Sequence, residues 1–515
     1  MNIKRTFTPA KCILLLASFL CLAITEVNAQ VFSFNNANGD HHWSNAENWL
    51  DGLKPSDENA IVTILADVIV DEDVTIQSLY DATPCNFILQ EGRSLTVNET
   101  LVWNKGGDFI LEDKAQLMHP EYAFQAKVLK KISAFDETHH LWNLIASPIQ
   151  QDIVPSTENG FLTDPESGYA LYSFNEENHT WINYKEMSFA IANEQGYLYA
   201  NAFDTTLVYD GYVRSAAVPA EVNLSYHATN NMLAGCNLVG NPFPCNAFVD
   251  RSYYTINESS NSLIAVALSS YTPITPCTGI IVKAVEVDEA VTFRHEISQS
   301  SEHQGYIEIT AAKSNAQDLI LDQALLSFNA GDDLGKFSLY EDAPSVYFTK
   351  DNHDLAILSI DSTDMLPLKF KAAENGSYTI HFEPKDLNLN YLHLIDNMTG
   401  SNIDLLSSPN YTFNANTSDY ASRFKLVFDP HYGIEEDDSS TGSETFAYYS
   451  DGRIIINDVE TCHGASLQIV DMTGRLVDVC SDVARNVSTV GMIPGIYVLR
   501  LVTSNGVKMQ KIIIQ

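Results

Sequence analysis

Val68-Ile-Val-Asp-Glu-Asp-Val-Thr-Ile76 is the stretch that decides the fold, because its pattern returns twice further along the chain. Phe87-Ile-Leu-Gln-Glu-Gly-Arg-Ser-Leu-Thr-Val97 is the second copy, and Phe109-Ile-Leu-Glu-Asp-Lys-Ala-Gln-Leu117 is the third. Each copy consists of an apolar triplet, a polar turn and a second short strand. A period of about 20 residues with this layout predicts the rungs of a β-solenoid, each burying its apolar face on the next.

Tryptophans flank this repeat and recur further on. Trp43 and Trp49 lie just before the first copy, where we expect them to cap the open N-terminal rung. Trp103 fits either the core or a ligand platform, and we favour the core. Trp181 has a polar, loop-like setting, and we favour packing over ligand stacking because large β cores also need aromatic residues.

The segment at 131–300 contains an internal echo. Trp142-Asn-Leu-Ile-Ala-Ser-Pro148 and Cys236-Asn-Leu-Val-Gly-Asn-Pro242 share Asn-Leu, an aliphatic residue and a final proline. A strand that ends in a proline turn explains both, because proline has no N–H to donate to a strand ladder.

The segment at 301–432 alternates apolar and polar residues in three runs, at 378–382, 411–413 and 424–428. This period of two predicts an antiparallel β-sandwich, with these apolar residues on its inner face: Tyr378, Ile380, Phe382, Tyr411, Phe413, Phe424, Leu426 and Phe428. The acidic stretch at 433–445 has too few apolar residues to pack, so it reads as a linker.

Helical periodicity is almost absent, so the whole chain is predicted to be all-β and multidomain. We expect a signal peptide at 1–29, a β-solenoid-like domain at 30–130, an all-β domain at 131–300, an antiparallel β-sandwich at 301–432, an acidic linker at 433–445, and a small immunoglobulin-like β-sandwich at 446–515.

The N-terminal segment, 1–29, reads as a secretory signal peptide. A basic start with Lys4 and Arg5 precedes the apolar stretch at 12–24, and Val-Asn-Ala then predicts cleavage between Ala29 and Gln30. The apolar stretch is too short to cross a membrane, and no later segment has about 18 consecutive apolar residues. We therefore expect an exported chain without a membrane-spanning segment.

The C-terminal segment, 446–515, contains several β-rich elements in a fixed order. Ser466-Leu-Gln-Ile-Val470 leads into the turn Asp471-Met-Thr-Gly474-Arg475, where Gly474 can take a positive φ and Asp471 can bond its own backbone. Pro494-Gly-Ile-Tyr-Val-Leu-Arg500 and Lys511-Ile-Ile-Ile514 follow. This order resembles the type A C-terminal sorting domain of proteins exported by the bacterial type IX secretion system.

The resemblance implies that the type IX secretion machinery recognises this module, and that the linker at 433–445 is cut after export. It also implies attachment to lipopolysaccharide at the cell surface (outer membrane), with free secretion as the alternative. The matching positions, which we take as the sorting signal, are Asp471, Gly474, Arg475, Pro494, Gly495, Tyr497 and Lys511. The alternative is an immunoglobulin-like domain without a sorting role.

The formal net charge of −37 restricts the partners of the protein. Such an excess of negative charge disfavours nucleic acid and anionic lipid as ligands. The acidic residues are scattered along the chain, which is typical of a solvated surface.

Six cysteines follow the signal peptide, and an oxidising compartment permits disulfides between them: Cys85, Cys236, Cys245, Cys277, Cys462 and Cys480. We predict a Cys462–Cys480 disulfide, because both residues fall in the terminal module. Cys236 paired with Cys245 or Cys277 is a second hypothesis, and free buried thiols are the alternative. No Cys-x-x-Cys occurs, so zinc-site spacing is missing.

Motifs for catalysis are missing as well: the sequence has no nucleophile elbow, no His-Glu-x-x-His and no phosphate-binding glycine loop. Adjacent histidines, at 41–42 and 139–140, point to opposite faces of a strand and are poorly placed to share a metal ion. Asp71-Glu-Asp73 is a weak calcium candidate that lacks spaced ligands. We expect no catalytic residue, metal or cofactor.

Two classes of function therefore compete. The leading interpretation is a non-catalytic surface protein with an adhesion, matrix or glycan-binding role and a glycan or host-protein ligand. The alternative is an extracellular polysaccharide-active enzyme, either a glycoside hydrolase or a lyase, because paired carboxylates occur in any chain with 66 acidic residues.

Overall fold

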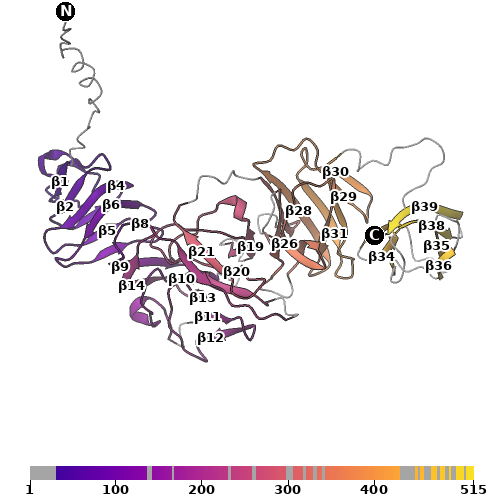
Figure 1. Ribbon diagram of the computed structural model, residues 1–515, viewed down its shortest axis with the longest axis horizontal. Helices are drawn as coiled ribbons and strands as arrows, with labels where there is room; N and C mark the ends of the chain where they lie inside the picture. The colour runs from indigo at the N-terminus through magenta and orange to yellow at the C-terminus, as the bar shows by residue number, and fades with distance from the viewer. Residues whose placement is uncertain are drawn as a thin grey trace, which may run out of the picture. The chain divides into compact units, whose positions relative to one another are not determined.

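A computed structural model gives the fold, and strands run through all its coloured parts (Figure 1). It describes residues 30–135, 142–164, 168–229, 233–257, 262–296, 305–316, 320–328, 333–338 and 343–429, together with the strands of the C-terminal module. Within these residues the only helices are short 3-10 turns: η1 (Ala46–Asn48), η2 (Leu50–Gly52), η3 (Thr157–Asn159) and η5 (Leu268–Ser270). The prediction of an all-β, multidomain chain is confirmed.

The chain divides into two compact units. Of the described residues, the first unit comprises 30–130, 208–217 and 243–245, and the second comprises the remainder. The exact bounds of the domains expected from the sequence stay a prediction.

The first unit is a β-solenoid built on two sheets. One sheet has the order β1 (Val31–Phe34), β2 (Ile61–Ile64), β4 (Val74–Asp81), β6 (Ser94–Val102), β8 (Gln116–Met118). The other has the order β14 (Thr205–Arg214), β9 (Ala123–Ile132), β7 (Phe109–Leu111), β5 (Phe87–Leu89), β3 (Val68–Val70).

The three repeat copies stack in register, as the sequence pattern predicts. Val68 pairs with Phe87 and Phe87 with Phe109, in strands that run parallel. The Phe87 and Phe109 rings are stacked 4.3 Å apart, and both side chains are buried. Repetition of an apolar triplet therefore builds a continuous core column.

Trp43 and Trp49 close the N-terminal end of the solenoid, as expected for a cap. Both are buried, their rings meet edge to face at 4.7 Å, and Trp49 Nε1 donates to the Trp43 carbonyl at 2.8 Å. Their segment also pairs with the first rung of each sheet, through a bridge from Trp49 to Phe34 and one from His42 to Ile69. This pairing covers edges that would otherwise be open to other chains.

The opposite end of the solenoid is completed by distant sequence. β14 adds to β9, although the two strands lie far apart along the chain. The Leu117 N–H donates to the Pro244 carbonyl at 2.8 Å, so a second distant segment also joins this end.

The second unit begins with three small sheets. The first has the order β10 (Asn143–Ala146), β13 (Gly196–Asn201), β11 (Tyr169–Asn175), β12 (Thr180–Asn183); the second has β15 (Ala220–Asn223), β21 (Ala290–Arg294), β17 (Phe248–Val249); the third has β16 (Cys236–Gly240), β20 (Gly279–Lys283), β18 (Tyr253–Ile256), β19 (Leu263–Val266).

The two echo segments form β10 and β16, and these strands touch. A Cβ atom added to Gly240 would lie 2.3 Å from the Cβ of Ala146, so only glycine permits this approach. Both strand ends bond to the same loop, because Ala146 N–H donates to the Cys277 carbonyl and Asn241 N–H to the Thr278 carbonyl. The echo therefore marks two strands that pack against each other.

An 11-stranded sheet forms the larger part of the second unit. Its path is β30 (Ser401–Asp404), β29 (His393–Asp396), β32 (Phe424–Val427), β27 (Met365–Lys371), β25 (Ser345–Lys350), β26 (His353–Ser359), β23 (Asp322–Ser327), β22 (Tyr306–Lys313), β28 (Gly376–Lys385), β31 (Asn410–Ala415), with β24 (Leu334–Gly335) paired to β26.

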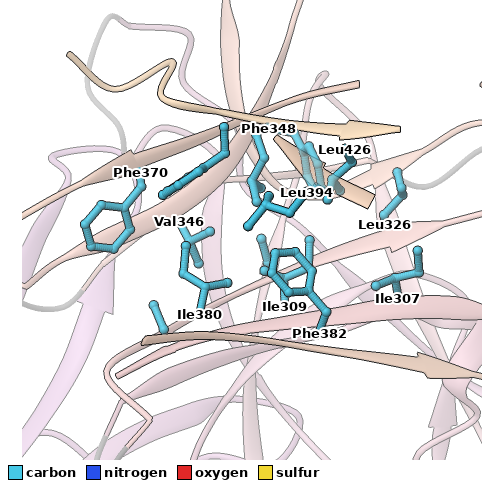
Figure 2. Packing of buried hydrophobic residues seen from close by; sticks show 14 of the residues in the cluster. Ile307, Ile309, Leu326, Val346, Phe348, Phe370, Ile380, Phe382, Leu394 and Leu426 are labelled. Atoms are coloured by element: carbon cyan, nitrogen blue, oxygen red, sulfur yellow. The ribbon is translucent and has the colours of Figure 1, made fainter. Parts of the chain in front are cut away.

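The core of this sheet contains the alternating residues that the sequence indicates. Tyr378, Ile380 and Phe382 are all buried, and Phe413 packs against Phe424 at 4.9 Å. Figure 2 shows side chains of β22 and β28 meeting those of the other half of the sheet across this core. The predicted period of two is confirmed.

The C-terminal module has two sheets. One has the order β33 (Ala447–Ser450), β34 (Arg453–Ile456), β37 (Asn486–Ser488), and the other β36 (Leu476–Ser481), β35 (Ser466–Asp471), β38 (Gly495–Thr503), β39 (Gly506–Ile514). Apolar side chains from both sheets share one core, which fits a small β-sandwich.

Candidate functional site

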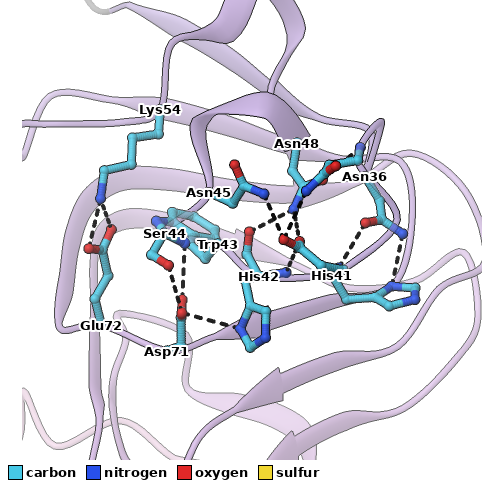
Figure 3. Close-up of polar contacts among 12 residues, drawn as sticks. Asn36, His41, His42, Trp43, Ser44, Asn45, Asn48, Lys54, Asp71 and Glu72 are labelled. Atoms are coloured by element: carbon cyan, nitrogen blue, oxygen red, sulfur yellow. Dashed lines mark hydrogen bonds and ion pairs between the residues drawn. The ribbon is translucent and has the colours of Figure 1, made fainter.

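A cluster of polar side chains that includes Asn45 and Asn48 lies at the N-terminal cap of the solenoid (Figure 3). Several of its hydrogen bonds end on the carboxylate of Asp40. Asn45 and Asn48 donate side-chain hydrogen bonds to this carboxylate at 2.6 and 2.5 Å, and the His42 N–H donates at 3.0 Å. These hydrogen bonds, with that of Asn48 the largest, lower the pKa of Asp40 well below its usual range. The carboxylate thus organises the turn that carries the capping tryptophans.

The two histidines at 41–42 contact different residues. His41 Nδ1 lies 2.9 Å from Asn36 Nδ2, whereas His42 Nδ1 lies 3.2 Å from Asp71 Oδ2. Burial acts to raise the pKa of Asp71, but hydrogen bonds from Ser44 outweigh it and the net pKa is lowered. The second pair, at 139–140, lies outside the described residues.

The acidic residues of the calcium candidate at 71–73 also contact different partners. Glu72 pairs with Lys54 at 2.7 Å, and Asp73 accepts the Ser94 N–H at 2.9 Å. The described part of the chain contains no group of three His, Cys, Asp or Glu residues arranged to hold a metal ion.

An exposed aromatic surface, absent from the sequence-based candidates, lies on β9 and β14. Tyr122 directly precedes β9 and is 87% exposed, and Tyr212 on β14 is 45% exposed. Between these strands, Gln125 Nε2 donates to Asp210 Oδ1 at 2.9 Å, and Lys127 lies 3.9 Å from Asp210. Because Asp210 and Tyr212 are two residues apart on a strand, they share a face.

The tryptophan candidates contribute to packing. Trp103 meets Phe87 and Phe109 edge to face at 5.5 and 5.4 Å, which agrees with the core interpretation. Trp181 lies on β12, not in a loop, because its segment pairs with β11. Its ring packs against Phe174 at 5.1 Å, so the loop-like setting predicted from polar neighbours is wrong.

Cys236 is a buried free thiol, so the hypothesis that it pairs with Cys245 or Cys277 is wrong. Burial raises the pKa of the Cys236 thiol to about 11. Cys462 lies outside the described residues, and the predicted Cys462–Cys480 disulfide stays a prediction.

The C-terminal module brings some of the proposed sorting positions together. Asp471 at the end of β35 pairs with Tyr497 on β38, and Tyr497 pairs with Ile512 on β39. Gly495 begins β38, opposite Ile514. Three further positions, Gly474, Arg475 and Pro494, lie outside the described residues.

The last two strands of the module, β38 and β39, contain buried and exposed residues. Tyr497, Ile512 and Ile514 are buried in the core, whereas Lys511 and Ile513 are exposed. Ile513 pairs with Ile496 on β38, and these side chains are 56% and 38% exposed. The exposed part of the module therefore has an apolar pair beside a lysine, and Tyr497 supports the fold from inside.

Comparison with known proteins gives two family matches, which cover different parts of the chain. A secretion system C-terminal sorting domain matches residues 450–515. A domain of unknown function, DUF8693, matches residues 34–279, a range that runs from the end of β1 to the start of β20. No curated protein matches the chain.

A likeness was also found to the crystal structure of a tetra-tandem repeat in the extending region of a large adhesion protein. It has 12% sequence identity and a TM-score of 0.10, covering 68% of this chain and 92% of that one. A TM-score this low carries no argument about fold or function.

The C-terminal match shows that the chain is a cargo protein of the type IX secretion system. It is exported, either to the cell surface or into the medium. None of the helices in the described residues is long and apolar enough to cross a membrane.

Proposed function

We propose that the exported passenger is a non-catalytic surface protein that binds a glycan or a host protein, in an adhesion or matrix role. The observation that supports this proposal is the exposed pair Tyr122 and Tyr212 beside the Gln125–Asp210 hydrogen bond. Exposed aromatic rings can stack on sugar rings, and amide and carboxylate groups can bond to sugar hydroxyls. An open strand surface of this kind suits an extended ligand better than a small enclosed one.

The test uses the mature protein purified from the producing cells, applied to glycan and host-protein arrays. We expect a ligand whose binding falls about tenfold or more in the double variant Tyr122→Ala/Tyr212→Ala, because stacking of one ring is worth about 0.5–1.5 kcal/mol. The matched control is Val285→Ala/Val287→Ala, which removes two exposed apolar side chains elsewhere. Equal loss in both variants, or no ligand at all, would contradict the proposal.

A hydrolysis and lyase screen on extracellular polysaccharides should accompany the arrays. Reproducible cleavage by the wild-type protein would overturn the non-catalytic proposal and favour a polysaccharide-active enzyme. Loss of that cleavage in the tyrosine double variant would locate the substrate on the same surface.

We also propose that the signal peptide ends at Ala29 and that the linker at 433–445 is cut after export. Attachment to lipopolysaccharide then holds the mature protein at the surface. The motifs at both ends of the chain support this sequence of events. Mass spectrometry of the mature protein should find Gln30 at one end, a C-terminus within the linker and a lipopolysaccharide adduct. An intact residue 446–515 segment on surface protein would refute the processing step.

The sorting role of residues 446–515 is tested separately by deletion. We expect the truncated protein to accumulate in the periplasm, because the machinery no longer finds its signal. Normal surface display of the truncated chain would mean that the module is only another β domain.

A further inference from the structure

A lysine and an aspartate lie in direct contact inside the second unit. Lys336 Nζ is 2.8 Å from Asp322 Oδ1 and 2.7 Å from Oδ2, and it also donates to the Gln323 carbonyl at 2.9 Å. The two side chains are only 10% and 11% exposed. Asp322 begins β23, and Lys336 directly follows β24.

This pair differs from another buried ion pair of the same unit. Arg423 binds Asp396 through two parallel hydrogen bonds at 2.9 and 2.7 Å, the geometry in which arginine serves as a permanent structural cation. Lysine is instead a compact amine that becomes nucleophilic when it loses its proton in a dry site. At Lys336, that amine touches both oxygens of a carboxyl group.

The surroundings favour the protonated form of Asp322. Asp322 accepts a short hydrogen bond, 2.6 Å, from the Val346 N–H, and the buried Tyr254 hydroxyl bonds to the residues on either side of Lys336. Burial raises the pKa of Asp322 even though Lys336 and the Val346 N–H oppose the shift. Transfer of one proton from the ammonium to the carboxylate removes both charges from this apolar region.

We propose that Lys336 and Asp322 form an intramolecular amide cross-link. The chemistry requires no cofactor. After the proton transfer to Oδ1, the Nζ lone pair attacks Cγ and the new C–N bond forms, while negative charge develops on Oδ2 near the Val346 N–H. The Cγ–Oδ1 bond then breaks, and the leaving hydroxyl takes a second proton from Nζ and departs as water.

The fixed contact between Lys336 and Asp322 speeds this reaction, because it holds the amine and the carboxyl group together. Groups held in a near-attack arrangement react far faster than the same groups free in solution. The product is a covalent loop from β23 to the end of β24, which would restrain the unfolded chain as a disulfide does but would resist reduction. For a protein exported outside the cell, such a link would protect this part of the sheet during unfolding.

The test is mass spectrometry of the mature wild-type protein, followed by a tryptic map. We expect a mass lower than that of the processed sequence by one water, and a branched peptide in which Lys336 is joined to Asp322 and is not cleaved by trypsin. Recovery of ordinary linear peptides with cleavage after Lys336 would overturn the proposal and leave a simple ion pair.

Two variants distinguish loss of water at Lys336 and Asp322 from loss of water elsewhere in the chain. Lys336→Arg keeps the cation but cannot form this amide, so its mass should be that of the full sequence. Asp322→Asn has a side-chain amide in place of the acid, so formation of the cross-link to Lys336 would release ammonia instead of water. A water loss that persists in Lys336→Arg would refute the assignment, whatever effect that substitution has on stability.

Discussion

Arg423 and Asp396 form a bidentate ion pair in the part of the second unit built on the 11-stranded sheet, with Arg423 Nε 2.9 Å from Oδ1 and Nη2 2.7 Å from Oδ2. The Tyr411 hydroxyl also donates to Oδ2 at 2.8 Å, and the guanidinium lies 4.5 Å from the centre of the Phe413 ring. With side chains 4% and 0% exposed, neither group can turn to water if the other is lost.

Asp396→Asn should therefore reduce the free energy of unfolding by about 3–5 kcal/mol, because it leaves the buried guanidinium without a counter-charge. Urea unfolding at pH 7 measures this loss. Glu374→Gln removes the partner of Lys313 in an exposed pair and should cost no more than about 1 kcal/mol. A loss in Asp396→Asn as small as in this control would mean that the pair does not stabilise the fold around the 11-stranded sheet.

Phe87→Ala should destabilise the solenoid by about 3–5 kcal/mol, because the ring is fully buried and stacks on Phe109 at 4.3 Å. Ile88→Ala is the matched control, since this neighbour in the same triplet points outward and is partly exposed. Chemical denaturation followed by tyrosine and tryptophan fluorescence compares the two. Equal losses would argue against a solenoid core at the first residue of the triplet.

The parts of the fold that follow a local pattern could be predicted from the sequence. Phe87 and Phe109 each begin an apolar triplet, and the regular spacing of these triplets predicts the rungs. Alternation along β28 predicts that Ile380 lies on its buried face. The addition of β14 to β9 has no such signal, because pairing between distant strands leaves no local pattern.

The candidate sites were harder to predict for the same reason. Tyrosine is common in the cores of β proteins, so the sequence does not show that Tyr122 and Tyr212 are exposed. Their exposure is evident only when the faces of β9 and β14 are known. Lys336 is one of 29 basic residues and Asp322 one of 66 acidic residues, and nothing local indicates that these two touch.

His119 should make the solenoid less stable in acid. Burial lowers the pKa of its imidazole to about 4 in the folded state, from 6.5. Its contribution to stability is therefore complete above about pH 6.5 and declines as the pH falls toward 4, by about 3 kcal/mol in total.

Comparison of His119→Leu with the wild type checks this effect, with unfolding measured at pH 7 and at pH 4.5. We expect the stability of the variant to fall less between these pH values. Parallel pH profiles for the two proteins would show that His119 does not titrate as its burial requires.

The Cys462–Cys480 disulfide should appear in a non-reducing peptide map of the full-length protein. Closing a loop of this length is worth about 3 kcal/mol in the chain-entropy model. Cys462→Ser/Cys480→Ser should therefore unfold at lower urea concentration within the terminal module. Two free thiols in the map would end this prediction.

Ile513→Asp should impair export while leaving the terminal module folded. Ile513 is 56% exposed beside Ile496 on the outer face of β38 and β39, near the exposed Lys511. A carboxylate placed there stays in water in the free protein and costs little, within about 0.5 kcal/mol. If the secretion machinery covers this face, the carboxylate becomes buried without a partner, and a binding penalty of about 1.4 kcal/mol alone would reduce binding tenfold.

Immunoblots of periplasmic and surface fractions measure the outcome, and protease resistance of the periplasmic protein establishes that it is folded. Val285→Asp is the matched control, because Val285 is 70% exposed in the passenger. Ile512→Asp should instead unfold the module, since that side chain belongs to its core. Normal surface display of Ile513→Asp would remove this face from the recognition surface, even if deletion of residues 446–515 still blocks export.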